Sequence, residues 1–332
     1  MKTFDLQKLI RPNVKAMKAY SSARDEFQEI NNDYIFLDAN ENPYGTEFNR
    51  YPDPQQRGLK VVLAERNGVG KEQILLGNGS DEVLDLIFRA FCNPGKDNVI
   101  GISPSYGMYQ VLANLNNVEY RKSLLIPDKF SIDVNDVLWK VDQYTKIIFL
   151  CSPNNPTGQF LDEKDIDFLL NSFNGFVVVD EAYIHFGSKD SWNKKLSLYP
   201  NLVIIQTLSK AFGLAGLRLG ILYANEDVVS ILNKIKLPYN INQFTQDYVM
   251  KCLIDKTYNE NLINLLSIEK NVLVKLLVEL FFVEKVYPSD SNFILIKVDD
   301  ANKRYRQLVE KGIVIRNRTH EDLCQNCLRI TV

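Results

Sequence analysis

Two cations in a segment of small and apolar residues have the clearest chemical meaning in this sequence. Lys210 and Arg218 stand eight residues apart in "TLSKAFGLAGLRLG" (207–220), among Gly, Ala and Leu. Partly desolvated charges are unfavourable unless a partner compensates for them. A lysine in such surroundings can lose its proton easily and attack a carbonyl, whereas the planar guanidinium of arginine suits a phosphate. Thr207 and Ser209 add hydroxyls that can join Arg218 around one anion.

Three further motifs carry polar groups next to apolar runs. "GNGSDE" (77–82) is a glycine-rich turn before a helical pattern, and free N–H groups at a helix start suit a phosphate. "SPNNPTG" (152–158) forms a rigid loop on which Asn155 can present an amide. In "VVVDEAY" (177–183), Asp180 follows an apolar run and needs a cationic or N–H partner.

Each motif alone also has an ordinary explanation: a capped helix, a surface loop, a salt bridge or a structural arginine. Together they supply a nucleophilic amine, a carboxylate, an amide and a phosphate-binding helix start. This set fits a phosphorylated aldehyde with a basic ring nitrogen, and pyridoxal 5'-phosphate is such a compound. We therefore expect a pyridoxal-phosphate site.

The elements that must position these groups alternate between short apolar strands and helices. We expect buried strands at 98–102, 146–151, 176–183, 202–209 and 219–224. A helix is expected from Ser80, as its N-cap, through "SDEVLDLIFRAFC". This order predicts an α/β fold with a largely parallel sheet, in which ligands gather at the carboxyl ends of the strands.

The pattern of predicted elements changes after about Tyr239, where long helical segments precede the possible strands "SNFILIKV" and "GIVIRNR". We expect a large domain at 36–240 with a mostly parallel central sheet flanked by helices. A smaller α+β domain would comprise residues 1–35 and 241–332.

Composition excludes several classes of function. The net charge of -2, with both signs interspersed, gives no basic face for nucleic acid. Apolar runs are broken by charges, so we expect no membrane segment. Two histidines exclude a multi-histidine metal centre, and Cys324 and Cys327 have no second pair to complete a zinc site. Five scattered cysteines form no disulfide framework, which predicts a cytoplasmic location.

The motifs also resemble a known family. "SPNNPTG", "DEAY" and "TLSKAFGLAGLRLG" resemble the fold-type-I aminotransferases, which depend on pyridoxal phosphate. Within that superfamily, "YSSARDEF", "LDANENPYG", "YPDP", "GNGSDE", "PSYGMYQ" and "CLRITV" closely resemble the histidinol-phosphate aminotransferases. The resemblance extends from about Leu9 to Val332.

The resemblance implies roles for the residues around the cofactor. Lys210 would bind the cofactor covalently and then move the proton between the substrate Cα and the cofactor. Asp180 would keep the pyridine nitrogen protonated, and Asn155 and Tyr183 would hydrogen-bond the phenolic oxygen. Tyr106 would stack on the ring. The phosphate would be bound by Ser80, Asp81, Thr207, Ser209 and Arg218.

The resemblance also implies a second subunit and a substrate site. Tyr51 would reach the phosphate from the neighbouring subunit, so the active enzyme should be a homodimer. Arg329 would bind the carboxylate of glutamate or 2-oxoglutarate. Arg316 and Tyr20 would contact the phosphate of the other substrate.

The implied reaction is reversible transfer of an amino group between L-histidinol phosphate and 2-oxoglutarate, in histidine biosynthesis. An aromatic amino-acid aminotransferase or a threonine-phosphate decarboxylase-like enzyme is the alternative, because fold and cofactor do not separate them. A cofactor-binding regulator is disfavoured, because no basic recognition helix is present. A catalytically inactive homologue is disfavoured because Lys210, Asp180 and Arg218 are all present.

Overall fold

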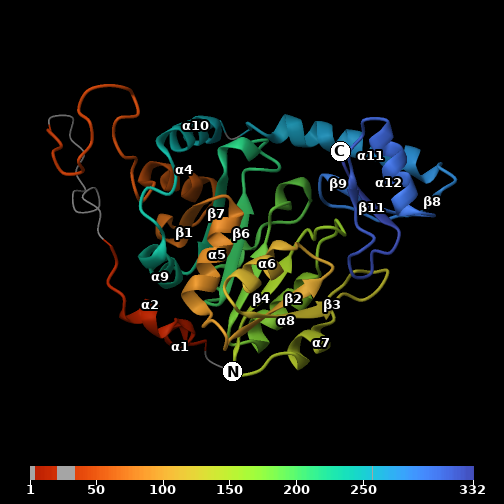
Figure 1. Ribbon diagram of the computed structural model, residues 1–332, viewed down its shortest axis with the longest axis horizontal. Helices are drawn as coiled ribbons and strands as arrows, with labels where there is room; N and C mark the ends of the chain where they lie inside the picture. The colour runs from red at the N-terminus through yellow and green to blue at the C-terminus, as the bar shows by residue number, and fades with distance from the viewer. Residues whose placement is uncertain (1–3, 21–33, 256) are drawn as a thin grey trace.

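A seven-stranded sheet forms the centre of the computed structural model, which describes residues 4–20, 34–255 and 257–332 (Figure 1). Its spatial order is β1-β7-β6-β5-β4-β2-β3, with β7 antiparallel to both neighbours and the other pairs parallel. The predicted mostly parallel sheet is confirmed. The strands are β1 (Ile74–Asn78), β2 (Asn98–Ser103), β3 (Glu119–Leu124), β4 (Thr145–Cys151), β5 (Phe176–Asp180), β6 (Leu202–Thr207) and β7 (Leu219–Ala224).

All five strands expected from apolar runs are present, although β5 and β6 end earlier than the runs suggested. β1 and β3 were not predicted. β3 is an edge strand with the sequence "EYRKSL", of which only one residue is buried, so it carries no apolar run. β1, with the sequence "ILLGN", is buried except for its last residue, and we did not assign its apolar run to a strand.

Helices cover both faces of the sheet because its strands alternate their side chains between two apolar cores. In β5, Phe176 and Val178 belong to one core, whereas Val177 and Val179 belong to the other. The first core includes α5 (Ser80–Phe91), α6 (Met108–Leu115) and α9 (Glu226–Ile235). The second includes α4 (Arg57–Asn67), α7 (Val134–Trp139), α8 (Glu163–Ser172) and α10 (Gln243–Ile254). This three-layer packing fixes the strand ends relative to one another.

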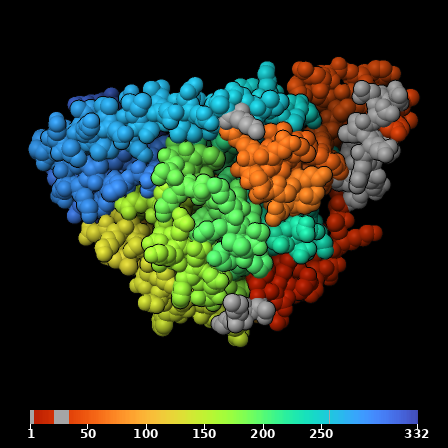
Figure 2. Space-filling model, turned by 180° about the vertical axis from the view of Figure 1, so that it is seen from behind, coloured from red at the N-terminus to blue at the C-terminus, as the bar shows by residue number. Residues whose placement is uncertain are grey.

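A smaller unit at the C-terminus lies at one end of the molecule, and residues near 40–50 lie at the other (Figures 1 and 2). Its antiparallel sheet has the order β10-β11-β9-β8, and Leu277, Ile296 and Leu328 contribute to its core. This confirms the expected smaller α+β part. Its elements are α11 (Glu260–Val278), β8 (Val283–Val286), β9 (Phe293–Val298), α12 (Ala301–Glu310), β10 (Arg316–Asn317) and β11 (Cys327–Thr331).

The described part of the N-terminal segment packs differently from our expectation. Short helices α1 (Leu6–Leu9) and α2 (Pro12–Ala16) place Leu9, Ile10 and Val14 in the core of the large sheet, not on the smaller unit. Their apolar side chains gave no signal of which core they join. The "YSSARDEF" motif lies outside the described residues after Tyr20. The division at 36–240 and 241–332 stays a prediction.

Candidate active site

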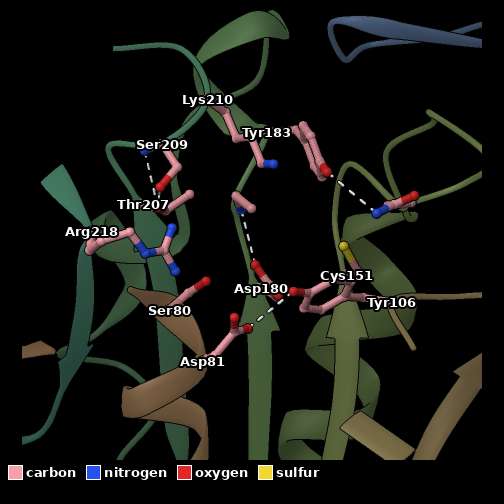
Figure 3. A pocket seen from close by; sticks show the side chains of 12 residues that line it. Ser80, Asp81, Tyr106, Cys151, Asp180, Tyr183, Thr207, Ser209, Lys210 and Arg218 are labelled. Carbon is pink, nitrogen blue, oxygen red and sulfur yellow. Dashed lines mark hydrogen bonds between the residues drawn. The ribbon is translucent and has the colours of Figure 1, made fainter. Parts of the chain in front are cut away.

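A pocket opens at the edge where β1, β4, β5 and β6 end and β7 begins (Figure 3). Ten of its twelve lining residues were expected from the sequence, and Cys151 and Ala182 were not. The lining residues are Ser80, Asp81, Tyr106, Cys151, Asn155, Asp180, Ala182, Tyr183, Thr207, Ser209, Lys210 and Arg218.

Two glycines allow the start of α5 to pack closely against β7. The N-cap of α5 is Gly79, with φ of 83°, and Ser80 is the first helical residue, so our assignment of Ser80 as the cap was wrong. A Cβ on Gly79 would lie 2.7 Å from the guanidinium of Arg218, and a Cβ on Gly220 would lie 2.3 Å from the Ser80 nitrogen. Only glycine allows this approach, which brings the helix start to the arginine.

The same end of the pocket gathers groups that bind anions. The Thr207 hydroxyl donates to the Ser209 hydroxyl at 3.0 Å, and both line the pocket with Ser80 and Arg218. The Arg218 side chain forms no ion pair among the described residues, and its one hydrogen bond is a long one to Ala215 O at 3.4 Å. A helix N-terminus, two hydroxyls and a guanidinium without a carboxylate partner form a phosphate-binding end.

Asp180, at the end of β5, is a buried carboxylate that faces the pocket. Its Oδ2 accepts from the Tyr109 hydroxyl at 2.7 Å, and its Oδ1 accepts from the Ala182 N–H at 3.1 Å. Burial raises the pKa of Asp180 to about 6 in spite of these hydrogen bonds. A cationic group in the pocket would favour the ionised form.

Lys210 supplies the amine of the pocket, and its Nζ lies 5.9 Å from the centre of the Tyr183 ring. Burial lowers the pKa of Lys210, and the charge of Arg329 lowers it further, while Asp180 and Asp81 act in the opposite direction. A lowered pKa increases the fraction of Lys210 that is the neutral, nucleophilic amine.

Two hydrogen-bonded pairs flank the pocket. The Tyr106 hydroxyl donates to Asp81 Oδ1 at 3.1 Å, and Asn155 Nδ2 donates to the Tyr183 hydroxyl at 3.3 Å. Burial raises the pKa of both tyrosine hydroxyls, so they stay protonated and can donate. Arg329 Nη1 donates to Asn155 Oδ1 at 2.5 Å, which joins the smaller unit to the pocket loop.

Four residues expected in the site do not line this pocket. Arg316 and Arg329 line an adjoining cavity of the smaller unit, where they are directly opposite each other on β10 and β11. Tyr51 is half-exposed and stacks on Tyr239, with ring centroids 4.5 Å apart. Tyr20 is exposed and lies outside both cavities.

Three residues at the site were missed. Tyr109 lies only three residues after Tyr106 in "PSYGMYQ", and its position in an apolar helical face gave it the appearance of a core residue. Cys151 is the last residue of an apolar strand, and Ala182 carries no polar group. Ala182 is close to Asp180 in the sequence, whereas the positions of Cys151 and Tyr109 beside Asp180 depend on how β4, β5 and α6 pack.

The fold and the site define a pyridoxal-phosphate-dependent enzyme of fold type I. The described residues contain no cluster of three or more His, Cys, Asp or Glu that could hold a metal ion. They also contain no helix that is long and apolar enough to span a bilayer.

Comparison with known proteins identifies the family. The profile of "Aminotransferase class I and II" matches residues 32–332. Histidinol-phosphate aminotransferase from Flavobacterium johnsoniae is 58% identical over 333 residues, which cover 100% of this chain and 95% of that protein. The protein of the same name from Flavobacterium psychrophilum is 55% identical over 332 residues, with the same coverage. The chain belongs to the histidinol-phosphate aminotransferase family within the class I and II aminotransferases.

Solved structures share the fold. Histidinol-phosphate aminotransferase from Clostridium acetobutylicum superposes with a TM-score of 0.78 and 25% identity, over 86% of each chain. The Sinorhizobium meliloti protein of that name, in complex with pyridoxal 5'-phosphate, gives a TM-score of 0.76 at 22% identity, over 85% of this chain and 78% of that chain.

The pocket fits pyridoxal phosphate, the cofactor of this family. The glycine-lined helix start leaves space for the backbone N–H groups to meet a phosphate. Asp180 is a buried carboxylate for the basic ring nitrogen, and Lys210 is an amine for the aldehyde. Each polar group of the cofactor has a chemical counterpart in the pocket.

Proposed function

We propose that this chain transfers an amino group reversibly between L-histidinol phosphate and 2-oxoglutarate, giving imidazole acetol phosphate and glutamate, in L-histidine biosynthesis. Relatives that bear the name histidinol-phosphate aminotransferase are 46% to 58% identical over at least 99% of this chain. The observation that carries the chemistry is the pocket in which Lys210 and Asp180 meet a phosphate-binding end.

Lys210 binds the cofactor and moves the proton at the reacting carbon of the substrate. When bound, pyridoxal phosphate supplies a protonated ring that withdraws electrons from that carbon. The lowered pKa of Lys210, caused first by burial, suits a group that must both accept and return a proton. Asp180 would pair with the ring nitrogen and favour its protonated form.

The remaining pocket residues hold the ring and the phosphate. Asn155 and Tyr183, which already form a hydrogen-bonded pair, provide two polar groups for the phenolic oxygen. Tyr106, which lines the pocket, would pack against the ring face. The phosphate is bound by the N–H groups of Ser80 and Asp81, the hydroxyls of Thr207 and Ser209, and the guanidinium of Arg218.

Arg329 binds the carboxylate of 2-oxoglutarate or glutamate beside Asn155. Its Nε is buried without a hydrogen-bond partner among the described residues, and the Arg329 side chain lines the cavity of the smaller unit. Arg316 lies opposite Arg329 on the same face of the strand pair and contacts the phosphate of histidinol phosphate. We propose the same contact for Tyr20, although Tyr20 lies outside both cavities of its own chain.

The active form is a homodimer in which Tyr51 completes the neighbouring site. Tyr51 does not line the pocket of its own chain and keeps 52% of its surface exposed, which supports a role in a partner's site. Five free cysteines are buried, and none is in a disulfide, which supports a cytoplasmic location.

Single-turnover absorbance tests the substrate. The cofactor-loaded enzyme is mixed separately with L-histidinol phosphate, phenylalanine and phosphothreonine. We expect rapid loss of the visible band of the bound cofactor with histidinol phosphate, and its recovery on addition of 2-oxoglutarate. An equal rate with phenylalanine would identify an aromatic aminotransferase, and release of carbon dioxide from phosphothreonine would identify a decarboxylase.

A further inference from the structure

Tyr109 lies behind the active-site carboxylate and has no assigned role. It belongs to α6 and is fully buried. Its ring stacks on Phe149, with centroids 4.9 Å apart and planes at 11°, and is nearly perpendicular to the ring of Tyr106, with centroids 5.6 Å apart. Packing from two sides fixes the ring, so its hydroxyl has one direction available, and it donates to Asp180 Oδ2 at 2.7 Å.

The hydroxyl of Tyr109 is the only side-chain donor to Asp180 among the hydrogen bonds of the described residues. The backbone N–H of Ala182 satisfies the other oxygen. The charges of Asp81 and Glu181 and the thiol of Cys151 also lie near Asp180, while Lys210 lies across the pocket. Burial and the neighbouring acids disfavour the ionised form of Asp180. The hydrogen bond that the Tyr109 hydroxyl donates stabilises this ionised form and so opposes both effects.

We propose that Tyr109 is a positioning residue, whose hydroxyl holds Asp180 ionised and oriented so that it keeps the proton on the cofactor's ring nitrogen. The inference rests on the role proposed above for Asp180. Tyr109 does not line the pocket, and it acts on the cofactor only through the carboxylate. A hydrogen bond to a charged group in a buried setting is strong enough for this effect.

A second buried tyrosine provides a matched control. Tyr223 on β7 is fully buried, and among the described residues its hydroxyl forms no hydrogen bond to a residue that lines the pocket. Removal of that hydroxyl changes a buried tyrosine without touching the site. Tyr223→Phe therefore measures the effect of the substitution itself.

The test uses enzyme loaded with pyridoxal phosphate labelled with ¹⁵N at the ring nitrogen. The ¹⁵N chemical shift is followed against pH in the wild type, Tyr109→Phe, Asp180→Asn and Tyr223→Phe. We expect Tyr109→Phe to lower the proton affinity of the ring nitrogen about tenfold or more, which moves its titration midpoint down by about one pH unit. Tyr223→Phe should titrate like the wild type.

Binding supplies a second readout. Tyr109→Phe should weaken binding of pyridoxal phosphate, but leave unchanged the affinity for an analogue in which carbon replaces the ring nitrogen. Equal weakening for both ligands would show that Tyr109 only supports packing, and would overturn the inference.

The Asp180→Asn arm separates this inference from the proposed function. If Asp180→Asn lowers the proton affinity of the ring nitrogen and Tyr109→Phe does not, Tyr109 has no such role. If neither substitution changes it, the role of Asp180 fails, and the inference fails with it.

A measurement on the unmodified enzyme covers the case in which Tyr109→Phe does not fold. With ¹³C-labelled tyrosine, proton NMR of the loaded enzyme should show a slowly exchanging, downfield hydroxyl proton on the Tyr109 ring. A rapidly exchanging hydroxyl would overturn the inference.

Discussion

Asp180 and Lys210 line one pocket, yet the described residues show no ion pair between them. Burial raises the pKa of the acid and lowers that of the amine, so both charged forms are disfavoured in the cofactor-free protein. A mutual ion pair would relieve both groups but would occupy the site. Without that ion pair, Asp180 and Lys210 stay available for the cofactor, and the cofactor-free protein is less stable.

Asp180→Asn should gain stability relative to the cofactor-free wild type by about 1–3 kcal/mol between pH 4 and pH 7, because the amide does not titrate. The pKa of about 6 in the folded state lies above the ordinary pKa of 3.8 for aspartate, so the folded state binds more protons between these two pH values. The contribution of Asp180 is therefore favourable below pH 4 and is lost as the pH rises through 6.

Chemical denaturation of the cofactor-free wild type and Asp180→Asn at pH 4 and pH 7 measures this difference. The advantage of the variant should shrink toward pH 4. His185, whose pKa burial lowers to about 4, changes stability in the opposite direction, but it is present in both proteins and cancels. An advantage that is equal at both pH values would contradict the prediction.

At the scale of elements, the junction of α5 and β7 depends on the absence of a side chain at Gly220. A Cβ there would lie 2.3 Å from the backbone of Gly79 and Ser80, which cannot rotate away. Gly220→Ala should reduce the free energy of unfolding by about 1–3 kcal/mol or more and weaken binding of pyridoxal phosphate. Gly216→Ala has open space at its Cβ and serves as the control. Thermal unfolding and cofactor titration test both variants, and equal behaviour would refute this account.

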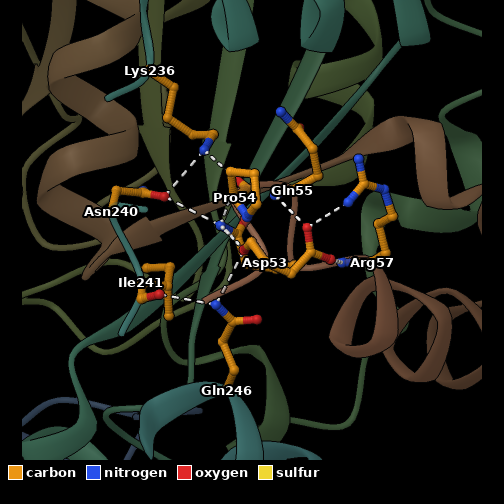
Figure 4. Close-up of polar contacts among 9 residues, drawn as sticks. Asp53, Pro54, Gln55, Arg57, Lys236, Asn240, Ile241 and Gln246 are labelled. Atoms are coloured by element: carbon orange, nitrogen blue, oxygen red, sulfur yellow. Dashed lines mark hydrogen bonds and ion pairs between the residues drawn. The ribbon is translucent and has the colours of Figure 1, made fainter. Parts of the chain in front are cut away.

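A polar cluster joins the chain after Tyr51 to the region between α9 and α10 (Figure 4). Lys236 is buried, and its Nζ donates to Pro54 O at 3.0 Å and to Asn240 Oδ1 at 3.1 Å. Gln246 Nε2 donates to Ile241 O at 2.9 Å and to Asp53 O at 3.3 Å. These bonds fix the segment that presents Tyr51.

Lys236→Met should reduce the free energy of unfolding by about 1–3 kcal/mol, because it removes the charged donor that Pro54 O and Asn240 Oδ1 share. The exposed Lys251→Met on α10 should change it by less than about 0.5 kcal/mol. Urea unfolding of the two variants makes the comparison. An Lys236→Met protein as stable as the control would show that the cluster contributes nothing to stability.

For the whole molecule, the proposed exchange of Tyr51 between subunits is tested with hybrids. Lys210→Ala and Tyr51→Ala proteins, each nearly inactive alone, are unfolded together and refolded. If Tyr51 serves the partner's site, every hybrid has one intact site, and random pairing restores roughly a quarter of wild-type activity. If Tyr51 serves its own site, mixing restores none. Size-exclusion chromatography with light scattering checks that the refolded proteins are dimers.

Local chemistry in the sequence predicted most of the candidate site. Asp180, Asn155 and Lys210 each follow an apolar run that could only be a buried strand, and parallel strands bring their carboxyl ends to one edge. Glycine at 79 and 220 sits where a close approach requires it. The positions of strands and turns depend on residues that are adjacent in the chain, so they can be predicted from the sequence alone.

Only the tertiary structure decided which distant elements meet. The contact of Tyr109 with Asp180 joins residues 71 positions apart, and that of Arg329 with Asn155 joins residues 174 apart. Leu9 and Val14 could have packed on either unit, and the shape of the large core placed them there. Apolar side chains and hydrogen-bond donors carry no information about their partner, so the order of strands and the packing of helices assigned these contacts.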